Sequence, residues 1–453
     1  MAAAVEAEGV IEDHRELVEW FEQGCKPRED WRCGTEHEKF VFRRSDFSRP
    51  AYDDPDGIGE LLRRLEVFGW EPRYEDGKII ALAQDAAGIT LEPGGQLELS
   101  GAPLETVHQT CSEVHAHLDQ CRQVGDIMGL GFLGIGFDPK WRRQDIPWMP
   151  KGRYALMRRY MPQVGSLGLD MMLRTCTVQV NLDFADEADM VDKFRLSLAL
   201  QPLTTVLFAD SPFREGRPTD YLSLRSHVWT DTDPNRCGML GFVFEEGFGF
   251  ERYAEYCLDV PMYFVYRDGH YIDVAGRSFR DFLEGRLPEL PGVRPHIGDW
   301  SDHVTTAFPE VRMKRYLELR GADGGPWGRL CGLSALWIGL LYDGAARAAG
   351  WDLCKHWTEE ERTWLRTEAP RLGFAAEIGG RSLHNIAKDM VAIARQGLRA
   401  RARLDGAGND ETGFLSDLEE IADSGVTAAE RKRTLFEGRW GGRVEPVFEE
   451  FAY

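Results

Sequence analysis

The stretch Cys33-Gly-Thr-Glu-His-Glu-Lys-Phe-Val-Phe42 decides the fold, because it reads as a β-strand with an unusual face. Successive side chains of a strand point to opposite faces, so Glu36 and Glu38 lie on the same face as Phe40 and Phe42. An isolated pair of glutamates at this spacing is most often a solvent-facing strand edge. A strand face that is acidic at one end and apolar at the other instead indicates the floor of a pocket.

Three further stretches carry acidic or amide side chains at the same spacing: Glu92 with Gln96-Leu97-Glu98, Gln179-Val180-Asn181 with Asp183, and Glu318-Leu319-Arg320. Taken alone, the first of these stretches fits an ordinary polar hairpin equally well, and the second fits an ordinary polar strand face equally well. If all these strands share one sheet, their carboxylates lie together. Two carboxylates about 4 Å apart repel by roughly 4 kcal/mol at an effective dielectric near 20. Such a face requires shared protons or bound divalent cations, and oxygen ligands select Mg²⁺, Mn²⁺ or Ca²⁺.

Arg320 lies beside Glu318 on one strand face, and this pair has two interpretations. It is either an ordinary ion pair or an electrophilic clamp that neutralises a transferred phosphoryl group or a tetrahedral oxyanion. Two basic clusters are candidates for polyphosphate contacts, although most of their members fit a solvated helix face: Arg312, Lys314 and Arg315, and Arg142, Arg143, Lys151, Arg153, Arg158 and Arg159.

Composition excludes several classes of function. The chain has 453 residues and a net charge of −21, which argues against binding to nucleic acid or to an anionic membrane surface. Its nine cysteines have no zinc-binding spacing, and their odd number indicates free thiols in a reducing compartment. Met1 to Asp13 lacks the features of a signal peptide, and the longest apolar run, Leu330 to Leu341, is too short to span a bilayer. We therefore expect a cytoplasmic protein.

Hydrophobic periodicity predicts an α+β protein. Short strands separated by turns are expected between residues 70 and 100, a strand at Phe132–Phe137, and a buried helix at Met190–Phe208. From Trp327 onward we expect helices at Leu330–Arg347, Ser382–Arg403, Phe414–Ile421 and Ala428–Glu437. Length alone favours two domains. Because the acidic strands extend from Glu36 to Arg320, we instead predict a single catalytic domain over 1–453, with a β-rich core at about 30–325 and a helical part at about 327–453.

Five motifs together closely resemble the plant-type glutamate–cysteine ligases. They are Gly34-Thr-Glu-His-Glu-Lys-Phe40, Leu91-Glu-Pro-Gly-Gly-Gln-Leu-Glu-Leu-Ser-Gly101, Arg174-Thr-Cys-Thr-Val-Gln-Val-Asn181, Arg225-Ser-His-Val-Trp-Thr-Asp-Thr-Asp233 and Arg315-Tyr-Leu-Glu-Leu-Arg-Gly-Ala-Asp323. The likeness extends from about residue 11 to Tyr453. It implies a curved, mostly antiparallel sheet with flanking helices, as in glutamine synthetase. The absence of a transit peptide suggests a bacterial member.

The resemblance implies ATP-dependent ligation of the γ-carboxyl of L-glutamate to the amine of L-cysteine through γ-glutamyl phosphate, the first step of glutathione biosynthesis. It further implies a set of ligands for Mg²⁺, with Mn²⁺ as a possible substitute: Glu36, Glu38, Glu92, Glu98, Gln179 and Glu318. Arg320 would be catalytic, whereas Arg225 and Arg236 would bind the α-carboxylate of glutamate. No residue is assigned to the adenine of ATP or to the cysteine side chain, and the oligomeric state is left open.

Three other functions stay open at this point. A related ligase could join glutamate to a different amine, because the strand motifs serve phosphoryl transfer and do not select the acceptor. A transferase of the guanido-kinase type would phosphorylate without ligation. A metal- or thiol-binding regulatory protein on a degenerate ligase fold is the non-enzymatic alternative, which the presence of every required acidic residue disfavours.

Overall fold

The computed structural model describes residues 9–453, so that most of the Met1–Asp13 segment lies outside the described residues. Within this range, nine strands form one sheet in the order β14-β15-β7-β1-β5-β4-β3-β2, with β6 also paired to β1. The strands are β1 (Cys33–Arg43), β2 (Glu71–Glu75), β3 (Lys78–Gln84), β4 (Ala87–Leu91), β5 (Leu97–Ser100), β6 (Leu130–Leu133), β7 (Thr177–Leu182), β14 (Val311–Met313) and β15 (Leu317–Asp323). Every pairing in this sheet is antiparallel.

The register of the central strands brings the acidic stretches side by side. Glu38 on β1 lies opposite Glu98 on β5. Glu36 lies opposite Gln179 on β7, and Asn181 on β7 lies opposite Glu318 on β15. Because directly paired residues share a face of the sheet, the polar side chains predicted from the strand pattern do lie on one face.

Three long helices cover the opposite face of the sheet: α3 (Val107–Met128), α6 (Glu187–Leu207) and α11 (Trp327–Leu341). Thr35 on β1 and Ser334 on α11 share a hydrogen bond of 2.6 Å between their hydroxyls. Thr205 on α6 donates to the backbone oxygen of Gly321 on β15 at 3.1 Å. These residues alternate with the glutamates along their strands, so the helices bury one face and leave the glutamates on the other.

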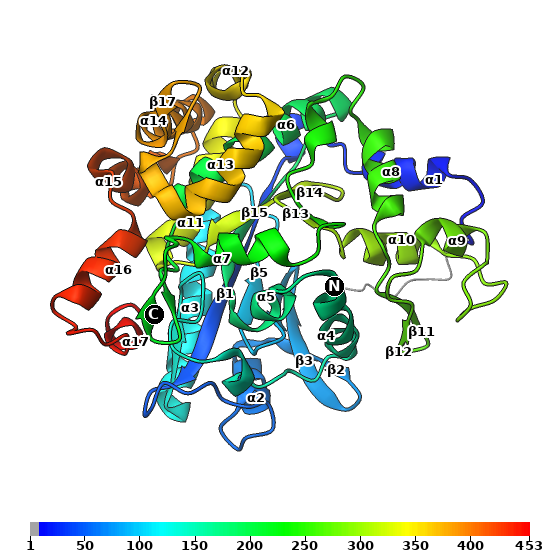
Figure 1. The fold of residues 1–453 in the computed structure, drawn as a ribbon, viewed down its shortest axis with the longest axis horizontal. Helices are drawn as coiled ribbons and strands as arrows, with labels where there is room; N and C mark the ends of the chain where they lie inside the picture. Colours follow the sequence, from blue (N-terminus) through cyan, green and yellow to red (C-terminus); the bar gives the residue numbers. More distant parts are fainter. Residues whose placement is uncertain (1–8) are drawn as a thin grey trace.

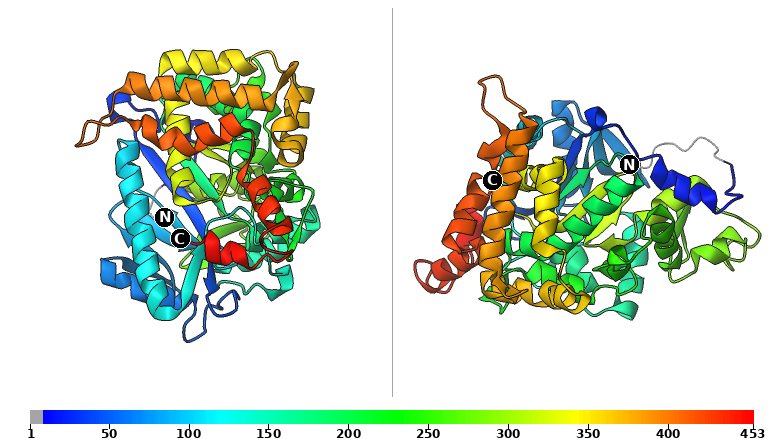
Figure 2. Two further views of the ribbon diagram at one scale, coloured as in Figure 1. Left: turned by 90° about the vertical axis from the view of Figure 1, so that its left-hand side faces the viewer. Right: turned by 90° about the horizontal axis from the view of Figure 1, so that it is seen from above.

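A helix behind this layer, α14 (Leu383–Arg401), packs directly on α11. The two helices approach so closely at Gly339 and Gly397 that a Cβ on Gly397 would lie 1.9 Å from the backbone oxygen of Gly339. Only glycine fits at such a contact. Figure 2 shows this helical layer, drawn in yellow and orange, beside the sheet.

The glutamate-bearing face is approached by shorter helices, α4 (Gly152–Val164), α5 (Gly168–Arg174) and α7 (Leu224–Val228), which Figure 1 shows in green.

The remaining helices are α1 (Arg15–Glu22), α2 (Ile58–Leu65), α8 (Phe250–Asp259), α9 (Phe279–Leu283), α10 (Ile297–Val304), α12 (Gly344–Cys354), α13 (Glu359–Leu372), α15 (Ser416–Ser424), α16 (Ala428–Glu437) and α17 (Pro446–Glu450). Two-residue and four-residue strands form four small sheets: β8 (Phe213–Arg214) with β9 (Arg217–Pro218), β10 (Cys237–Gly238) with β13 (Phe308–Pro309), β11 (Phe264–Arg267) with β12 (His270–Asp273), and β16 (Glu377–Ile378) with β17 (Arg381–Ser382).

The predicted α+β fold with a large antiparallel sheet is confirmed, but three local predictions differ from the structure. The single helix expected at Leu330–Arg347 is two helices, because Asp343 caps the start of α12 by accepting from the backbone N–H of Ala346. The strand expected at Phe132–Phe137 is β6, which ends at Leu133. The helix α13 was not predicted at all.

The largest cluster of buried apolar side chains contains residues of the β-rich part, such as Val180 and Leu319, and of the helical part, such as Trp337 and Met390. A shared core of this kind supports the prediction of one domain, which stays a prediction. No helix in the part of the chain that the structure describes is both long and apolar enough to cross a membrane.

Candidate active site

One half of the glutamate-bearing face, which we call the carboxylate cluster, consists of Glu36, Glu38, Glu92 and Glu98. Asn181 donates to Glu36 at 2.8 Å, and the backbone N–H of Thr177 donates to Glu38 at 3.0 Å. Glu98 is buried and accepts from the Thr90 hydroxyl at 2.8 Å. Glu92 lies on the turn between β4 and β5 and is half-buried. These hydrogen bonds orient the carboxyl groups without balancing their charge.

The pKa values of Glu36, Glu38 and Glu98 reflect their burial together with the charges of neighbouring carboxylates. Loss of solvent, together with the charges of Glu318 and Glu98, raises the pKa of Glu36 to about 7. Loss of solvent is also the main reason why the pKa values of Glu38 and Glu98 are raised, and the charge of Glu92 adds to both. Glu36, Glu38 and Glu98 therefore hold protons at pH values at which ordinary glutamates have lost them.

The other half of the face is the Glu318 cluster, which contains Glu318, Arg312, Lys314 and Arg320. Glu318 is fully buried. Arg312 donates to both of its oxygens, at 2.6 and 2.9 Å, Lys314 lies 2.8 Å from one of them, and Arg320 also donates to this carboxylate. Burial acts to raise the pKa of Glu318, but the three cations outweigh it and hold that pKa well below its usual range.

Arg320 connects the two halves, because its guanidinium also donates to Oε1 of Gln179 at 2.7 Å. The proximity of Arg320 to the glutamates, predicted from the sequence, is therefore present in the structure. Its guanidinium lies between the carboxylate cluster and the cluster in which three cations surround the Glu318 carboxylate.

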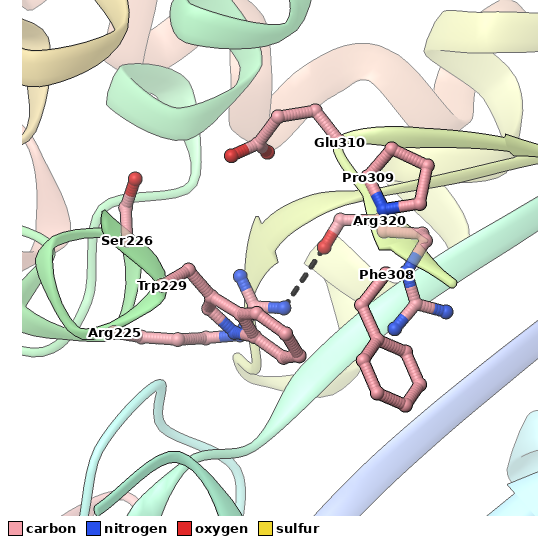
Figure 3. Close-up of a pocket in the computed structure, with 7 residues that line it drawn as sticks. All are labelled: Arg225, Ser226, Trp229, Phe308, Pro309, Glu310 and Arg320. Carbon is pink, nitrogen blue, oxygen red and sulfur yellow. Dashed lines mark hydrogen bonds between the residues drawn. The ribbon is translucent and has the colours of Figure 1, made fainter. Parts of the chain in front are cut away.

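A pocket opens beside Arg320 and is shown in Figure 3. It is lined by Arg225, Ser226, Trp229, Phe308, Pro309, Glu310 and Arg320. Arg225 is 3% exposed and donates to the backbone oxygen of Arg320 at 2.9 Å. Its Nε, like Nε1 of Trp229, is buried and has no hydrogen-bond partner among residues 9–453. Buried donors without partners carry a free-energy cost unless a ligand satisfies them, so this wall of the pocket suits a carboxylate.

A buried aspartate, Asp323, fixes this pocket wall to the sheet. Its carboxylate accepts from the hydroxyls of Ser211 at 2.6 Å and Ser223 at 2.7 Å. The Ser223 side chain in turn caps α7 by accepting from the backbone N–H of Ser226, and Ser211 accepts from the backbone N–H of Arg225 at 3.2 Å. The helix that carries Arg225 is thus tied to the strand that carries Arg320.

Two predicted residues lie outside this assembly. Arg236 is fully buried, pairs with Asp233 at 2.6 Å and donates to the backbone oxygens of Thr306 and Pro261. Its guanidinium is thus held by protein groups. Asp183 lies beyond the end of β7 and pairs with Lys26 at 2.7 Å. The structure does not bring either residue to the glutamates or into the pocket beside Arg320.

The basic residues suggested for polyphosphate contacts separate in the structure. Arg312 and Lys314 belong to the Glu318 cluster, whereas Arg315 pairs with Gln23. Lys151 is buried with its Nζ 2.9 Å from the backbone oxygen of Leu91. Burial, with the charge of Arg153, lowers the pKa of Lys151 to about 8 despite the opposing charges of Glu92 and Glu98. Lys151 and Arg153 are therefore the basic groups next to the carboxylate cluster.

The chemistry of the carboxylate cluster fits a divalent cation. Its oxygen donors, with Gln179 beside them, are the type that Mg²⁺ and Mn²⁺ prefer, and the raised pKa values of Glu36, Glu38 and Glu98 mean that a bound cation would take the place of protons. Within residues 9–453, no three His, Cys, Asp or Glu side chains are arranged to hold a metal ion. The donors are present, and side-chain adjustment would be needed to complete a site.

Comparisons with known proteins give the chain a family. The family model described as glutamate-cysteine ligase family 2 (GCS2) matches residues 32–450. The chain belongs to this family. It is 56% identical over 452 residues to a chloroplastic glutamate–cysteine ligase of Nicotiana tabacum, covering 100% of this chain and 84% of the relative. It is likewise 56% identical over 439 residues to the chloroplastic enzyme of Arabidopsis thaliana, covering 97% of this chain and 82% of that one.

A solved structure shares the fold of this family member. The glutamate–cysteine ligase of Francisella tularensis, solved in complex with AMP, superposes with a TM-score of 0.54 at 12% sequence identity, covering 93% of this chain and 89% of that chain. At this identity the likeness concerns the fold alone. It agrees with the antiparallel sheet and flanking helices described above.

Sequence reasoning missed two charged residues of this region, Glu310 and Asp323. Glu310 lies between two short strands and is not part of an alternating acidic pattern. Asp323 closes a quoted motif, but its partners Ser211 and Ser223 lie 112 and 100 residues away in the chain. The only sequence signal for Asp323 was its place three residues after Arg320, at the end of the same strand.

Proposed function

We propose that this family member joins L-glutamate to L-cysteine by way of γ-glutamyl phosphate, with the carboxylate cluster as the place where ATP phosphates and divalent cations are held. Glutamate–cysteine ligation, the first step of glutathione biosynthesis, is its activity. The observation that carries the proposed mechanism is the position of Arg320, between a carboxylate cluster without countercharge and a pocket with unpartnered donors.

Each group of residues has a separate proposed role. Glu36, Glu38, Glu92 and Glu98, with Gln179, would hold Mg²⁺ or Mn²⁺, which when bound supplies positive charge against the ATP phosphates. Arg320 would stabilise the negative charge of the transferring phosphoryl group and of the tetrahedral adduct. Arg225 would bind the α-carboxylate of glutamate through its planar guanidinium. The metal role of Glu318 and the substrate role of Arg236 are proposals too, and both would require these residues to exchange their present ion-pair partners.

The compartment of the protein and its amine acceptor are further parts of the proposal. All nine cysteines are free thiols, which supports a reducing compartment such as the cytoplasm. The related plant enzymes are named chloroplastic, so a cytoplasmic location for this chain rests on its free thiols alone. A ligase that uses a different amine acceptor is the second candidate, because the structure assigns no residue to the cysteine side chain.

One assay tests the proposed function. The purified protein is incubated with ATP, Mg²⁺, glutamate and a panel of amines that includes cysteine, and the products are followed by mass spectrometry. We expect γ-glutamylcysteine, ADP and phosphate in equal amounts. A different dipeptide as the main product would favour the second candidate, and a stable phosphorylated product would indicate a kinase.

A further inference from the structure

Glu310 holds a fixed position at the pocket beside Arg320. It lies between β13 and β14, and its backbone is bound on both sides. Its N–H donates to the oxygen of Gly238 at 3.0 Å, and its oxygen accepts from the N–H of Arg320 at 3.1 Å. The side chain therefore projects from a backbone that is rigidly tied to the strand carrying Arg320.

The carboxylate of Glu310 has one protein partner that leaves part of it available. Arg366 on α13 lies 2.8 Å from Oε1 through Nη2 and donates to the same oxygen through Nε at 3.0 Å. A carboxylate offers about four lone-pair sites, so contacts to Oε1 alone do not use its full capacity. Figure 3 shows the Glu310 carboxylate directed across the pocket towards α7.

The charges around the pocket match L-glutamate better than L-cysteine. Arg225 and Arg320 are positive, and the unpartnered N–H groups of Arg225 and Trp229 suit a carboxylate. Glu310 adds the only carboxylate among the residues that line this pocket. L-Glutamate carries two carboxyl groups and keeps its ammonium group throughout the reaction. The amine of cysteine must instead lose its positive charge before it can attack, so a carboxylate held against it as a fixed ion-pair partner would oppose the reaction.

We propose that Glu310 binds the α-ammonium group of L-glutamate and thereby selects an amino acid over a plain dicarboxylic acid. This inference rests on the proposed function, because it takes glutamate as the substrate of the pocket. In this arrangement Arg225 and Trp229 face the α-carboxylate, Glu310 faces the ammonium group, and the γ-carboxyl is left to react beside Arg320. Arg366 holds the Glu310 carboxylate in place by contacts to Oε1.

The competing explanation is that Glu310 serves only to hold Arg366. Glutarate separates the two, because it has the carboxyl groups of glutamate without the ammonium group. Binding of glutamate and of glutarate to the full-length protein is measured by calorimetry with Mg²⁺ and a non-hydrolysable ATP analogue. The variants are Glu310→Gln, the conservative Glu310→Asp, and Glu368→Gln as a matched control, since Glu368 on the same helix as Arg366 pairs with Arg371 instead.

We expect Glu310→Gln to weaken glutamate binding about tenfold or more, the size of effect typical for a hydrogen bond to a charged group, and to leave glutarate binding within about twofold. Glu310→Asp should show a smaller selective loss, and Glu368→Gln should change neither affinity. An equal loss for both ligands, or no loss for either, would overturn the role of Glu310. If Glu310→Gln does not fold, the same comparison with Glu310→Asp decides.

Failure of this inference and failure of the proposed function give different results. Formation of γ-glutamylcysteine by the wild-type protein, together with equal losses for both ligands in Glu310→Gln, would contradict the Glu310 inference alone. Selective loss of glutamate binding in the variant, with no dipeptide formed by the wild-type protein, would contradict the ligase proposal alone.

Discussion

Glu318 on β15 and Glu38 on β1 are glutamates on the same face of one sheet, yet their neighbours carry opposite charges. Glu318 is surrounded by Arg312, Lys314 and Arg320, which hold its pKa well below the usual range. Burial, together with the charges of Glu92 and Glu98, raises the pKa of Glu38. Glutamates on one face of a sheet can therefore belong to sites of different charge. One half is a carboxylate surrounded by three cations, whereas the other half is a group of carboxylates that suits an external cation.

The largest difference between the halves should appear in stability. Glu318→Gln removes the negative charge beneath three cations, and breaking a buried ion pair costs about 3–5 kcal/mol. We expect the free energy of unfolding, measured by urea denaturation in EDTA, to fall by about this amount. Glu38→Gln should instead leave it unchanged or increase it, because that substitution removes repulsion between carboxylates. Equal losses in the two variants would show that the halves do not differ in charge balance.

Substitution within the carboxylate cluster should have a large effect on activity, although its effect on stability is small. Glu38→Gln keeps the size of the side chain but removes a proposed metal-ligand charge, so we expect turnover to fall well over tenfold and the Mg²⁺ requirement to increase. The measurement is dipeptide formation as a function of Mg²⁺ concentration. Glu71→Gln on the edge strand β2 is the control, because Glu71 is 72% exposed and belongs to the same sheet. Wild-type turnover with a normal Mg²⁺ requirement would refute the role of Glu38.

Arg320 contacts both halves of the face, so a conservative substitution there tests the contact between the two halves. Arg320→Lys keeps the charge next to Glu318 but loses the planar group that also reaches Gln179. We expect turnover to fall by about tenfold, with smaller changes in the apparent affinities for glutamate and ATP. Steady-state kinetics with each substrate varied in turn provide the measurement. An increase in KM alone would mean that Arg320 binds substrate in the ground state only.

Much of the fold could be predicted from the sequence because its signals are local. The alternation in Glu36-His37-Glu38 and the Pro-Gly-Gly turn before β5 placed the glutamates on strands, and α16 has the predicted bounds. The helix α13 was missed although Thr358 and Glu361 form a capping box at its start. Local patterns therefore located most of these elements, although they gave the wrong extent at Leu330–Arg347 and Phe132–Phe137.

The division of the face into two halves could not be predicted in the same way. Glu318 and Glu38 look alike in sequence, and the pairing of Glu318 with Arg312 depends on the antiparallel register of β14 and β15. Glu310 depends on Arg366, which lies 56 residues away on the unpredicted helix α13. Charge balance is a property of neighbours in space, so it follows from register and packing.

A further expected effect is a pH dependence of stability in the absence of divalent cations, and it has opposite signs in the two halves. In the unfolded chain Glu36 loses its proton near its ordinary pKa of 4.5, whereas in the folded protein it keeps the proton until about pH 7. Between these values the folded state binds more protons, so the contribution of Glu36 to stability is full below about pH 4.5 and is lost as the pH rises towards 7.

Glu318 behaves in the opposite sense, because its lowered pKa makes its contribution full above the unfolded value and lost as the pH falls. In EDTA, we therefore expect Glu36→Gln to gain stability relative to the wild-type protein as the pH rises from about 4.5 to about 7. The same Gln side chain can still accept from Asn181, so the comparison isolates the charge. Urea denaturation at a series of pH values gives the difference, with Glu71→Gln as the control. A constant difference across this range would mean that Glu36 ionises normally and that the carboxylate cluster already has its countercharge.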